Sequence, residues 1–411
     1  MQRRIIHYDM DYYYAQVMAK YDSNLLGRPV IIGAKPNERG VVATCNYEAR
    51  EYGVHSGMSS YKAKKLCPKG LFLHPDIKMI KHESDIIAKI AKSFSDVVEF
   101  IALDEAYIDI SLTRQLFMEG DVKKIALDLK EKIYAATQLT CSVGMGYNKF
   151  SSKIASGINK PNGFADFTNQ KAFADFLIDK PVEIIYGIGS HIARTLKKHR
   201  ILTVRQIISK GEVELKRIFG IYGTFLFQMA QGIDDREVVS SFEEKGIGNS
   251  RTLYKNISGA QEIKKALIPV VKEASYRLRK KGKLARTITL RIKYSDMKSI
   301  TRSQTVSPAL RRTVDIYNTA CKIVDSKLGC VDDIRLVGVR LSNLVKNEAS
   351  QLDVFVHTDS HKQSKLEKID NLAFKLRKKY GYDVVSDPFD HLVKGTQFAY
   401  SMTKYFSQKE D

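Results

Sequence analysis

The chain has 411 residues, of which 44% are hydrophobic and 27% are charged. This composition is typical of a folded globular protein and argues against intrinsic disorder. Lys and Arg outnumber Asp and Glu by 67 to 46, a net charge of +21, which favours a polyanionic partner such as nucleic acid or an acidic membrane surface.

Length and motif content indicate the number of domains, the cellular location and the state of the cysteines. Two or more domains are expected, because a domain usually holds about 100 to 200 residues. No apolar run approaches the ~20 residues of a membrane span and no signal-peptide core is present, so we expect a cytoplasmic, nucleoid-associated protein without a membrane partner. The five scattered cysteines contain no C-x-x-C pair and are expected to be reduced packing residues rather than disulfides or zinc ligands.

The first 165 residues alternate predicted strands and helices. A buried strand is predicted over 3–9, two strands that meet at an acidic tip over 97–110, and an amphipathic helix over 121–136. The strand-like "TCSVGMGYNK" follows at 140–149. This order predicts one mixed sheet with helices packed on it.

The rest of the chain changes character twice. Residues 166–233 are predicted to be helical and are broken by short glycine turns, and the charged stretch 234–246 has no periodic apolar face and is predicted to be a linker. Residues 247–345 again alternate strand-like and helix-like segments. We therefore expect three or four domains.

Acidic residues lie at the ends of two predicted strands. In "IIHYDMDYYYAQV" (5–17), Asp9 and Asp11 point the same way if the strand continues that far, while Asp104 and Glu105 occupy the tip between two strands. Each acid could simply be an exposed turn residue, since turns are rich in Asp. If the strands instead bring three carboxylates together, the cluster suits Mg²⁺, and paired ions serve in-line displacement at phosphorus.

Several cations suit phosphate contacts. Tyr47 and Arg50 are spaced as on one helical face, and Arg can hold a phosphate through two hydrogen bonds. Lys160 precedes a Pro-Asn-Gly turn that would fix its backbone. Taken singly, a residue such as Arg50 or Lys160 is more often a solvated surface cation.

Two further segments are candidates for contact with a nucleic-acid backbone. "YGIGSHIARTLKKH" (186–199) fits a helix, a tight turn at Gly187 and Gly189, and a second helix whose N-terminal amides bind phosphate, with basic residues after it. "RLRKKGKLARTITLRIKY" (277–294) is the densest basic run and leads into a strand. A solvated loop is the alternative for this run. The DNA-binding residues predicted from the two segments are Gly187, Gly189, Lys197, Lys198, Arg291 and Lys293.

Five motifs in this order carry a specific resemblance: "DMDYYYA", "ATCNYEAR", "LDEAYIDI", "VGMGYNKFSSKIAS" and "KPNG". The sequence is similar from residue 1 to about 345 to the Y-family DNA polymerases, the translesion group that includes the bacterial polymerase IV and polymerase V types. The resemblance implies an α+β multidomain fold shaped as a right hand. Its expected parts are a palm (1–10 and 76–165), fingers (11–75), a thumb with helix-hairpin-helix turns (166–233), a linker (234–246), a little finger (247–345) and a C-terminal tail (346–411).

The resemblance also implies site residues. Asp9, Asp104 and Glu105 match the catalytic metal-binding carboxylates, with the carbonyl of Met10 as a further ligand, and the expected cofactor is a pair of Mg²⁺ ions, for which Mn²⁺ can substitute. Asp11 matches a family position but is not included among the ligands, and Ala102 stands where the family often has Ser. The residues that match nucleotide contacts are Tyr14, which would be the steric gate against a 2′-OH, Thr44, Tyr47, Arg50 and Lys160.

A short segment after the last predicted domain resembles the bacterial sliding-clamp-binding pentapeptide. It consists of Gln351, Leu352, Asp353, Val354 and Phe355. An extended peptide of this kind would insert Leu352 and Phe355 into an apolar pocket. The alternative is a chance match on a short strand. The expected partners are thus primer-template DNA, dNTPs and a sliding clamp, and the protein is expected to be a monomer.

The predicted function is template-directed DNA synthesis of low fidelity across damaged template. It would proceed by two-metal phosphoryl transfer from dNTPs to a primer 3′-OH, without a proofreading exonuclease. Two alternatives remain at this point: a palm-type nucleotide cyclase, which would use similar paired acids, and a non-catalytic scaffold that binds DNA and the clamp. Primer extension separates the cyclase from the polymerase, and intact acids argue against the scaffold.

Overall fold

The computed structural model describes residues 3–112, 122–241, 243–329 and 332–346, together with 372, 374–376 and 379. The chain divides into two compact units, each built from two separate stretches of sequence. The first unit is Met1–Gly27 with Lys78–Phe242, and the second is Arg28–Ile77 with Glu243–Asp411. The chain therefore passes three times from one unit to the other.

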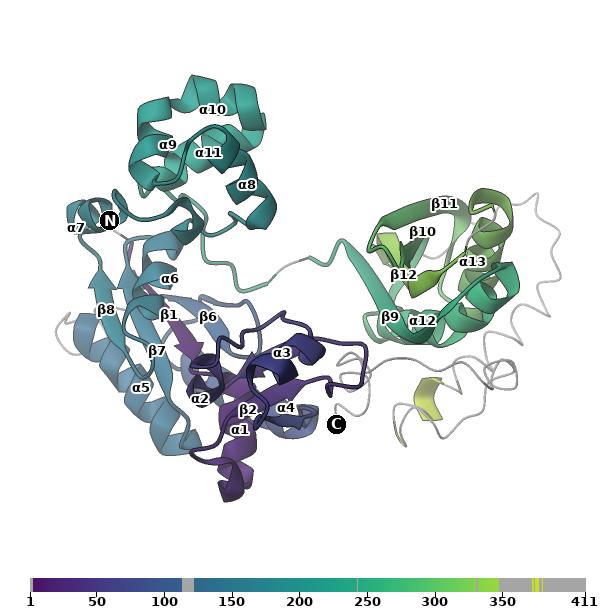
Figure 1. The fold of residues 1–411 in the computed structure, drawn as a ribbon, viewed down its shortest axis with the longest axis horizontal. Helices are drawn as coiled ribbons and strands as arrows, with labels where there is room; N and C mark the ends of the chain where they lie inside the picture. The colour runs from purple at the N-terminus through teal and green to yellow at the C-terminus, as the bar shows by residue number, and fades with distance from the viewer. Residues whose placement is uncertain are drawn as a thin grey trace. The chain divides into compact units, whose positions relative to one another are not determined.

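The first unit contains a five-stranded sheet with the strand order β5-β6-β1-β7-β8 (Figure 1). The central β1 (Ile5–Met10) is antiparallel to β6 (Glu105–Asp109) and to β7 (Cys141–Gly146). At the edges, β5 (Val98–Phe100) pairs antiparallel with β6, and β8 (Phe164–Phe167) pairs parallel with β7. The mixed sheet predicted from the sequence is therefore confirmed.

The helices of this part of the first unit are α1 (Tyr13–Tyr21), α4 (Ile77–Lys92), α5 (Val122–Thr137) and α6 (Lys149–Ile158). Both α5 and α6 pack against β7, and α5 confirms the amphipathic helix predicted over 121–136. Asn148 caps α6 by accepting from the backbone N–H of Ser151. The helix lies so close to β7 that a Cβ at Gly144 would overlap its backbone, which accounts for the glycines in "VGMG".

A helical region with its own apolar core follows β8. Its helices are α7 (Gln170–Leu177), α8 (Ser190–Lys198), α9 (Val204–Lys210), α10 (Glu212–Phe219) and α11 (Ile221–Ala230). The α-helix expected before Gly187 is wrong: a single 3₁₀ turn, η4 (Val182–Ile184), stands there. Pro181 and Gly187 lie too close together in sequence to leave room for a longer helix.

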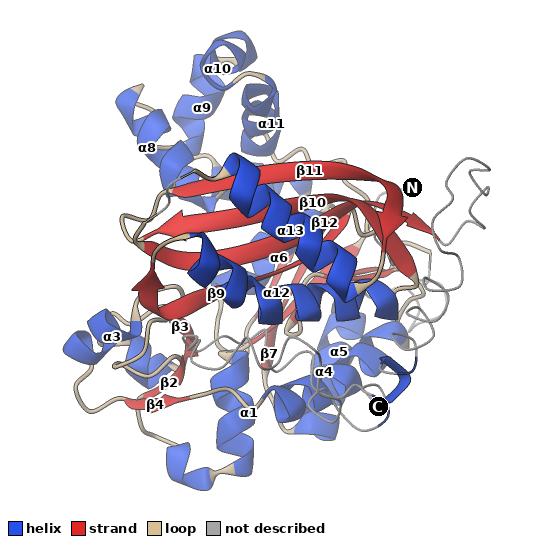
Figure 2. Cartoon of the chain, turned by 90° about the vertical axis from the view of Figure 1, so that its right-hand side faces the viewer, coloured by secondary structure: helices blue, strands red, loops and turns tan. Residues whose placement is uncertain are grey.

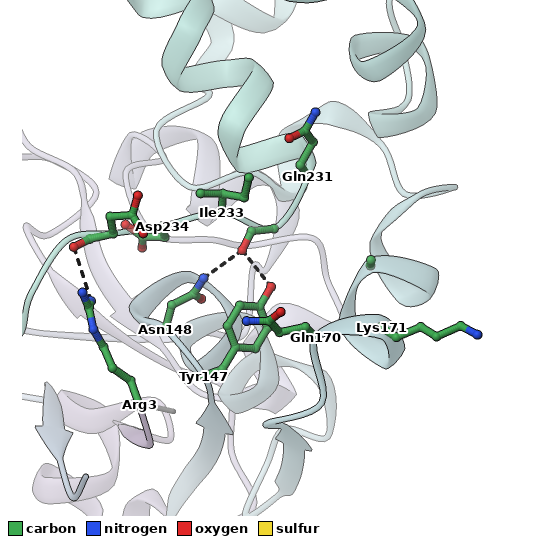
Figure 3. A pocket seen from close by; sticks show the side chains of 11 residues that line it. Arg3, Tyr147, Asn148, Gln170, Lys171, Gln231, Ile233 and Asp234 are labelled. Atoms are coloured by element: carbon green, nitrogen blue, oxygen red, sulfur yellow. Dashed lines mark hydrogen bonds between the residues drawn. The ribbon is translucent and has the colours of Figure 1, made fainter. Parts of the chain in front are cut away.

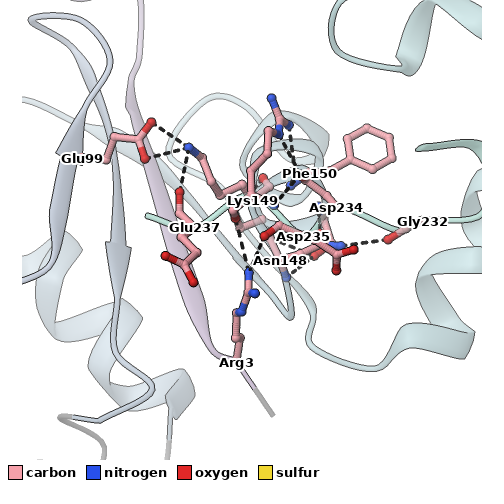
Figure 4. A network of polar contacts seen from close by, with 12 residues as sticks. Arg3, Glu99, Asn148, Lys149, Phe150, Gly232, Asp234, Asp235 and Glu237 are labelled. Atoms are coloured by element: carbon pink, nitrogen blue, oxygen red, sulfur yellow. Dashed lines mark hydrogen bonds and ion pairs between the residues drawn. The ribbon is translucent and has the colours of Figure 1, made fainter. Parts of the chain in front are cut away.

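The segment after α11 is held against the sheet of this unit (Figure 4). Lys149 Nζ lies 2.6 Å from both carboxylate oxygens of Glu99, and Glu99 Oε2 also accepts from the Val239 N–H at 3.0 Å. Asp234 Oδ2 accepts from the Phe150 N–H at 3.1 Å. The stretch predicted as a linker, 234–246, thus includes a part that is tied to the first unit.

The second unit contains a small sheet with the order β3-β2-β4. Its elements are β2 (Val30–Gly33), β3 (Val42–Cys45), β4 (Leu71–Leu73), α2 (Tyr47–Arg50) and α3 (Ser60–Leu66). Residues 11–27, predicted as part of the fingers, belong instead to the first unit. A long-range contact ties this segment to the first unit, because the buried Tyr13 donates its hydroxyl to the carbonyl of Ile80 at 2.7 Å.

The second unit also contains a four-stranded antiparallel sheet with the order β11-β10-β12-β9. Figure 2 shows α12 and α13 on one of its faces, and these helices cover one core of buried aliphatic side chains. The elements are β9 (Gly246–Ile257), α12 (Ala260–Lys280), β10 (Lys283–Tyr294), β11 (Ser299–Leu310), α13 (Thr313–Lys327) and β12 (Ile334–Lys346).

None of the helices in the described part of the chain combines the length and the apolar character that crossing a membrane requires. Four cysteines fall in the described part, and all four are free thiols. Three of them, Cys45, Cys67 and Cys141, are buried, as expected of packing residues.

Candidate active site

Three carboxylate residues meet at one end of the central strand pair. The antiparallel register places Asp9 of β1 opposite Glu105 of β6, and the Met10 N–H donates to the carbonyl of Asp104 at 2.9 Å. Residues almost a hundred positions apart in sequence are thereby fixed by backbone hydrogen bonds alone. The structure brings together the acids that the sequence predicted and sets the backbone of Met10 beside them.

Two lysines pair with these acids. Lys160 Nζ lies 2.5 Å from Asp9 Oδ1, and Lys153 Nζ of α6 lies 2.5 Å from Glu105 Oε2. The sequence predicted Lys160 but missed Lys153. A signal was available, because Lys149 and Lys153 are four residues apart on one face of α6 and pair with two different glutamates of the sheet.

His7 is a second residue that the sequence reasoning missed. Its ring is fully buried, with Nδ1 at 2.8 Å from the hydroxyl of Ser156 and Nε2 at 3.5 Å from Glu105 Oε2. Burial lowers the pKa of His7, so the ring is neutral at pH 7. As the residue two before Asp9, it lies on the same face of β1, which was the available signal.

The acids have opposed pKa shifts. Burial, followed by the charges of Asp9 and Glu105, raises the pKa of Asp104 to about 6. Burial opposes ionisation of Glu105 too, but the neighbouring His7 and Lys153 outweigh it and lower the pKa to about 2. The charge of Asp104 is therefore less well compensated by the protein than the charge of Glu105.

The donor chemistry of this cluster fits a hard divalent cation, because the side chains that meet there offer carboxylate oxygens. The raised pKa of Asp104 reports negative charge that a cation would neutralise. In the described part of the chain, however, no three His, Cys, Asp or Glu side chains are already gathered as a metal site. The carboxylates that face Lys153 and Lys160 would have to turn toward a metal ion.

Tyr14 lies near the same cluster. It is in the first turn of α1 and is half-buried, with its ring centroid 5.9 Å from that of Tyr13. Burial and then the charge of Asp104 raise the pKa of its phenol, which places that phenol within electrostatic reach of the acids. The predicted gate residue therefore lies near Asp104, one of the predicted metal-binding carboxylates.

The other predicted nucleotide contacts belong to the second unit. Thr44 lies on β3, and Tyr47 and Arg50 lie on α2. The Arg50 guanidinium stacks 4.9 Å from the centroid of the Tyr47 ring, and its Nε donates to the carbonyl of Cys45 at 3.2 Å. The predicted shared helical face is thus present, and it fixes the direction of the Arg50 side chain.

The predicted DNA-binding residues of the helical region fall in two places. Gly187 has φ +103° and accepts the hydroxyl of Tyr222 at 2.9 Å, and Gly189 is the N-cap of α8. Lys197 and Lys198 are in the last turn of α8, roughly 11 Å along the helix axis from its first residue. The structure does not bring these lysines to the glycine turn, so they cannot share one phosphate with it.

Arg291 and Lys293 lie on β10, on the face of the sheet opposite the buried Ile288, Leu290 and Ile292. Their cross-strand neighbours on β11 are Thr301 and Ser299. Small hydroxyl residues beside two cations give this sheet face a polar, basic character.

The five residues of the predicted clamp motif, 351–355, lie outside the described residues.

A pocket of about 520 Å³ lies elsewhere in the first unit (Figure 3). Tyr147 and Asn148 both donate to the carbonyl of Gly232, at 2.7 and 2.8 Å, and Arg3 donates to the carbonyl of Asp235 at 3.3 Å. These hydrogen bonds belong to the contact between the sheet and the segment after α11. None of the residues lining this pocket is a predicted site residue, so the candidate active site is the acidic cluster.

Comparison with known proteins identifies the family of the chain. Residues 8–157 match the model of the impB/mucB/samB family, and residues 244–354 match the model of its C-terminal domain. The chain is 36% identical over 356 residues to DNA polymerase IV of Staphylococcus haemolyticus, covering 86% of this chain and 98% of the relative. It is 38% identical over 365 residues to DNA polymerase IV of Clostridioides difficile, covering 87% and 98%.

Solved structures that resemble this chain are also DNA polymerases. A Y-family DNA polymerase chimera of Dbh and Dpo4 superposes with a TM-score of 0.74 at 27% identity, covering 84% of this chain and 100% of that one. The insertion ternary complex of Dbh DNA polymerase gives 0.60, and DinB from Sulfolobus solfataricus gives 0.57, with the same identity and coverage. The chain belongs to the impB/mucB/samB family and is a Y-family DNA polymerase.

Proposed function

We propose that this protein is a template-directed DNA polymerase of low fidelity that extends a primer across damaged template, without a proofreading exonuclease. The observation that carries the proposal is the register between β1 and β6, which sets Asp9, Asp104 and Glu105 at one point of the sheet. The relatives named DNA polymerase IV, matched over almost their whole length, support the same reaction.

In this proposal Asp9, Asp104, Glu105 and the carbonyl of Met10 would hold two divalent ions, Mg²⁺ in the cell or Mn²⁺ as a substitute. The ions would supply Lewis-acid chemistry, which lowers the pKa of the primer 3′-OH and stabilises the leaving pyrophosphate. The residues proposed to contact the triphosphate are Lys160 in the first unit and Thr44, Tyr47 and Arg50 in the second unit. Tyr14 closes the sugar position, so that a 2′-OH meets its ring.

The polar surfaces described above would bind primer-template DNA. The Gly187 turn offers backbone amides to a phosphate, and Lys197, Lys198, Arg291 and Lys293 offer cations that track the backbone without reading sequence. We propose the domain assignment of a palm, fingers, thumb and little finger for this chain, with the amendment that residues 11–27 pack with the palm. The segment 351–355 would recruit a sliding clamp, and the polymerase would act as a monomer in the cytoplasm.

Primer extension on a template with an abasic site tests the proposal. Wild-type protein with Mg²⁺ should extend past the lesion, and Asp104→Ala should lower the rate by at least about a hundredfold, since even the partners of metal ligands are worth 10- to 100-fold. Asp85→Asn removes an acid from an exposed surface ion pair on α4 and should leave the rate unchanged. Lesion bypass unaffected by Asp104→Ala would instead favour the scaffold, and a cyclic nucleotide as product would favour the cyclase.

A further inference from the structure

Asp11 is a buried carboxylate to which the proposed reaction gives no role. Its side chain is fully buried, and it accepts three hydrogen bonds. Oδ2 accepts from Thr140 Oγ1 at 2.9 Å and from the Asn162 N–H at 2.8 Å, and Oδ1 accepts from Ser142 Oγ at 2.8 Å. Burying a carboxylate costs free energy unless hydrogen-bond donors compensate it. The three donors therefore show which part of the protein Asp11 binds.

The donors converge on the turn that follows Lys160. The Asn162 N–H bonds directly to Asp11, and the Gly163 N–H donates to Ser142 Oγ at 3.1 Å, while that hydroxyl donates to Asp11. Asn162 has φ +51°, in the left-handed region that Asn adopts more readily than most other non-glycine residues. The Asp11 carboxylate therefore holds the amide of Asn162 directly and the amide of Gly163 through Ser142.

The same short piece of backbone carries both Asp11 and Asp9. The Asp11 N–H donates to the Thr140 carbonyl at 3.1 Å, and Gln16 Nε2 donates to the Asp11 carbonyl at 2.7 Å, so the main chain at Asp11 is fixed on both sides. Lys160, two residues before Asn162, reaches Asp9 Oδ1 at 2.5 Å. Lys130 Nζ and the Val143 N–H also hold the turn, by donating to the carbonyls of Asn162 at 2.6 Å and Gly163 at 3.0 Å. Asp11 is the group that links the amides of the turn to the backbone that carries Asp9.

We infer that Asp11 is a positioning residue that holds the 160–163 turn and so aims the Lys160 ammonium at the phosphates of the incoming nucleotide. It touches neither nucleotide nor metal ion. The ionised carboxylate suits this task because it only accepts hydrogen bonds, and all three of its partners donate. The inference rests on the proposed function, since it assigns Lys160 to nucleotide binding.

Asp11→Asn tests the inference, because the amide keeps the shape but has one acceptor oxygen in place of two and adds donors that face other donors. With a normal primer, the KM for dNTP should rise by roughly 10- to 100-fold, in the range measured when partners of ligating residues are removed, while kcat changes little. On a primer without a 3′-OH, which cannot react, equilibrium binding of dNTP should weaken by the same factor.

A double-substitution cycle separates positioning from a general loss of structure. Lys160→Ala should weaken dNTP binding in the wild type but should add little in an Asp11→Asn background, because the ammonium is already misdirected. Ser142→Ala keeps the carboxylate but removes the link to Gly163, so it should give a smaller rise in KM. It also serves as the second variant if Asp11→Asn does not fold.

Three outcomes would overturn the inference. They are an unchanged KM in the Asp11→Asn variant, fully additive effects of Asp11→Asn and Lys160→Ala, and a fall in kcat alone. Each of these presumes that the wild type extends primers. A wild type that does not extend primers would overturn the proposed function instead, so the two failures are distinguishable.

Discussion

At the scale of single residues, Asp104 shows how an active site can oppose stability. Its raised pKa, about 6 against an ordinary 3.8, means that between these pH values the folded state holds a proton that the unfolded state has lost. The free energy of unfolding therefore falls as the pH rises through that window. At pH 7 the ionised, partly buried carboxylate destabilises the metal-free fold.

Asp104→Asn should therefore stabilise the metal-free protein at pH 7, by roughly 1 to 2 kcal/mol once solvent screening is allowed for. The gain should shrink toward zero near pH 4, where the wild-type carboxyl is protonated in the folded state. The difference in stability between Asp104→Asn and the wild type is measured from thermal unfolding midpoints, in the presence of a chelator, between pH 4 and pH 7. Asp85→Asn is the control, and an Asp104→Asn gain that did not vary with pH would contradict the assignment.

Tyr14 permits a second test at this scale. If its ring blocks a 2′-OH by size, Tyr14→Ala should admit ribonucleotides, whereas Tyr14→Phe should keep the discrimination because the ring remains. The measurement is the ratio of kcat/KM for a dNTP and the matching ribonucleotide. Unchanged sugar selection in Tyr14→Ala would remove Tyr14 from this role.

At the scale of elements, the segment after α11 behaves as part of the first unit because Lys149 and Glu99 anchor it. Both side chains are almost completely buried, and Glu99 also accepts the Val239 N–H. Removing one member of a buried ion pair leaves an uncompensated charge and typically costs about 3 to 5 kcal/mol. The ordered position of the segment after α11 should therefore depend on the Lys149–Glu99 ion pair.

Lys149→Met should speed hydrogen exchange in residues 232–240 far more than elsewhere in the helices of the first unit. Lys171→Met removes an equal charge from an exposed position of α7 and should leave the exchange pattern unchanged. Mass-spectrometric exchange on the intact protein gives the comparison. Equal protection of 232–240 in both variants would show that other contacts hold the segment.

The open face of the four-stranded sheet gives another prediction at this scale. Arg291→Ala and Lys293→Ala should each weaken DNA binding to a similar degree for all sequences and lower the slope of log K against log salt concentration by about one. Lys265→Ala on α12, which packs on the other side of this sheet, removes the same charge and should change neither quantity. The measurement is the affinity of each variant for a labelled duplex over a range of salt concentrations. Equal effects of Arg291→Ala, Lys293→Ala and Lys265→Ala would contradict the prediction.

At the scale of the whole molecule, the sequence predicted most of what local pattern and motif order determine. The strands that carry Asp9 and Glu105, the α5 helix and the shared helical face of Tyr47 and Arg50 were predicted. Lys153, His7 and the anchoring of residues 232–240 were missed. Periodicity places Lys153 on one face of α6 and His7 on the face of β1 that carries Asp9, but it does not report their partners, which lie dozens of residues away in the sequence. The membership of residues 11–27 in the first unit was missed for the same reason, since it follows from the burial of Tyr13.

The proposed binding of a sliding clamp by residues 351–355 would bring the whole polymerase to its template. If 351–355 binds a sliding clamp, Leu352→Ala with Phe355→Ala should abolish the stimulation of primer extension by added clamp. Extension without clamp should remain at the wild-type level, which serves as the internal control. Full stimulation of the double variant would show that the resemblance of this pentapeptide to a clamp motif is accidental.

The two lysines beside the acids have one more consequence. With their ammonium groups next to Asp9 and Glu105, the protein supplies its own counter-ions when no divalent ion is bound. If the proposed cofactor is magnesium, we expect folding not to depend on it, unlike in small domains that unfold when a chelator removes their metal. Withdrawal of magnesium should therefore silence such a polymerase reversibly, leaving an intact molecule that resumes synthesis when the ion returns.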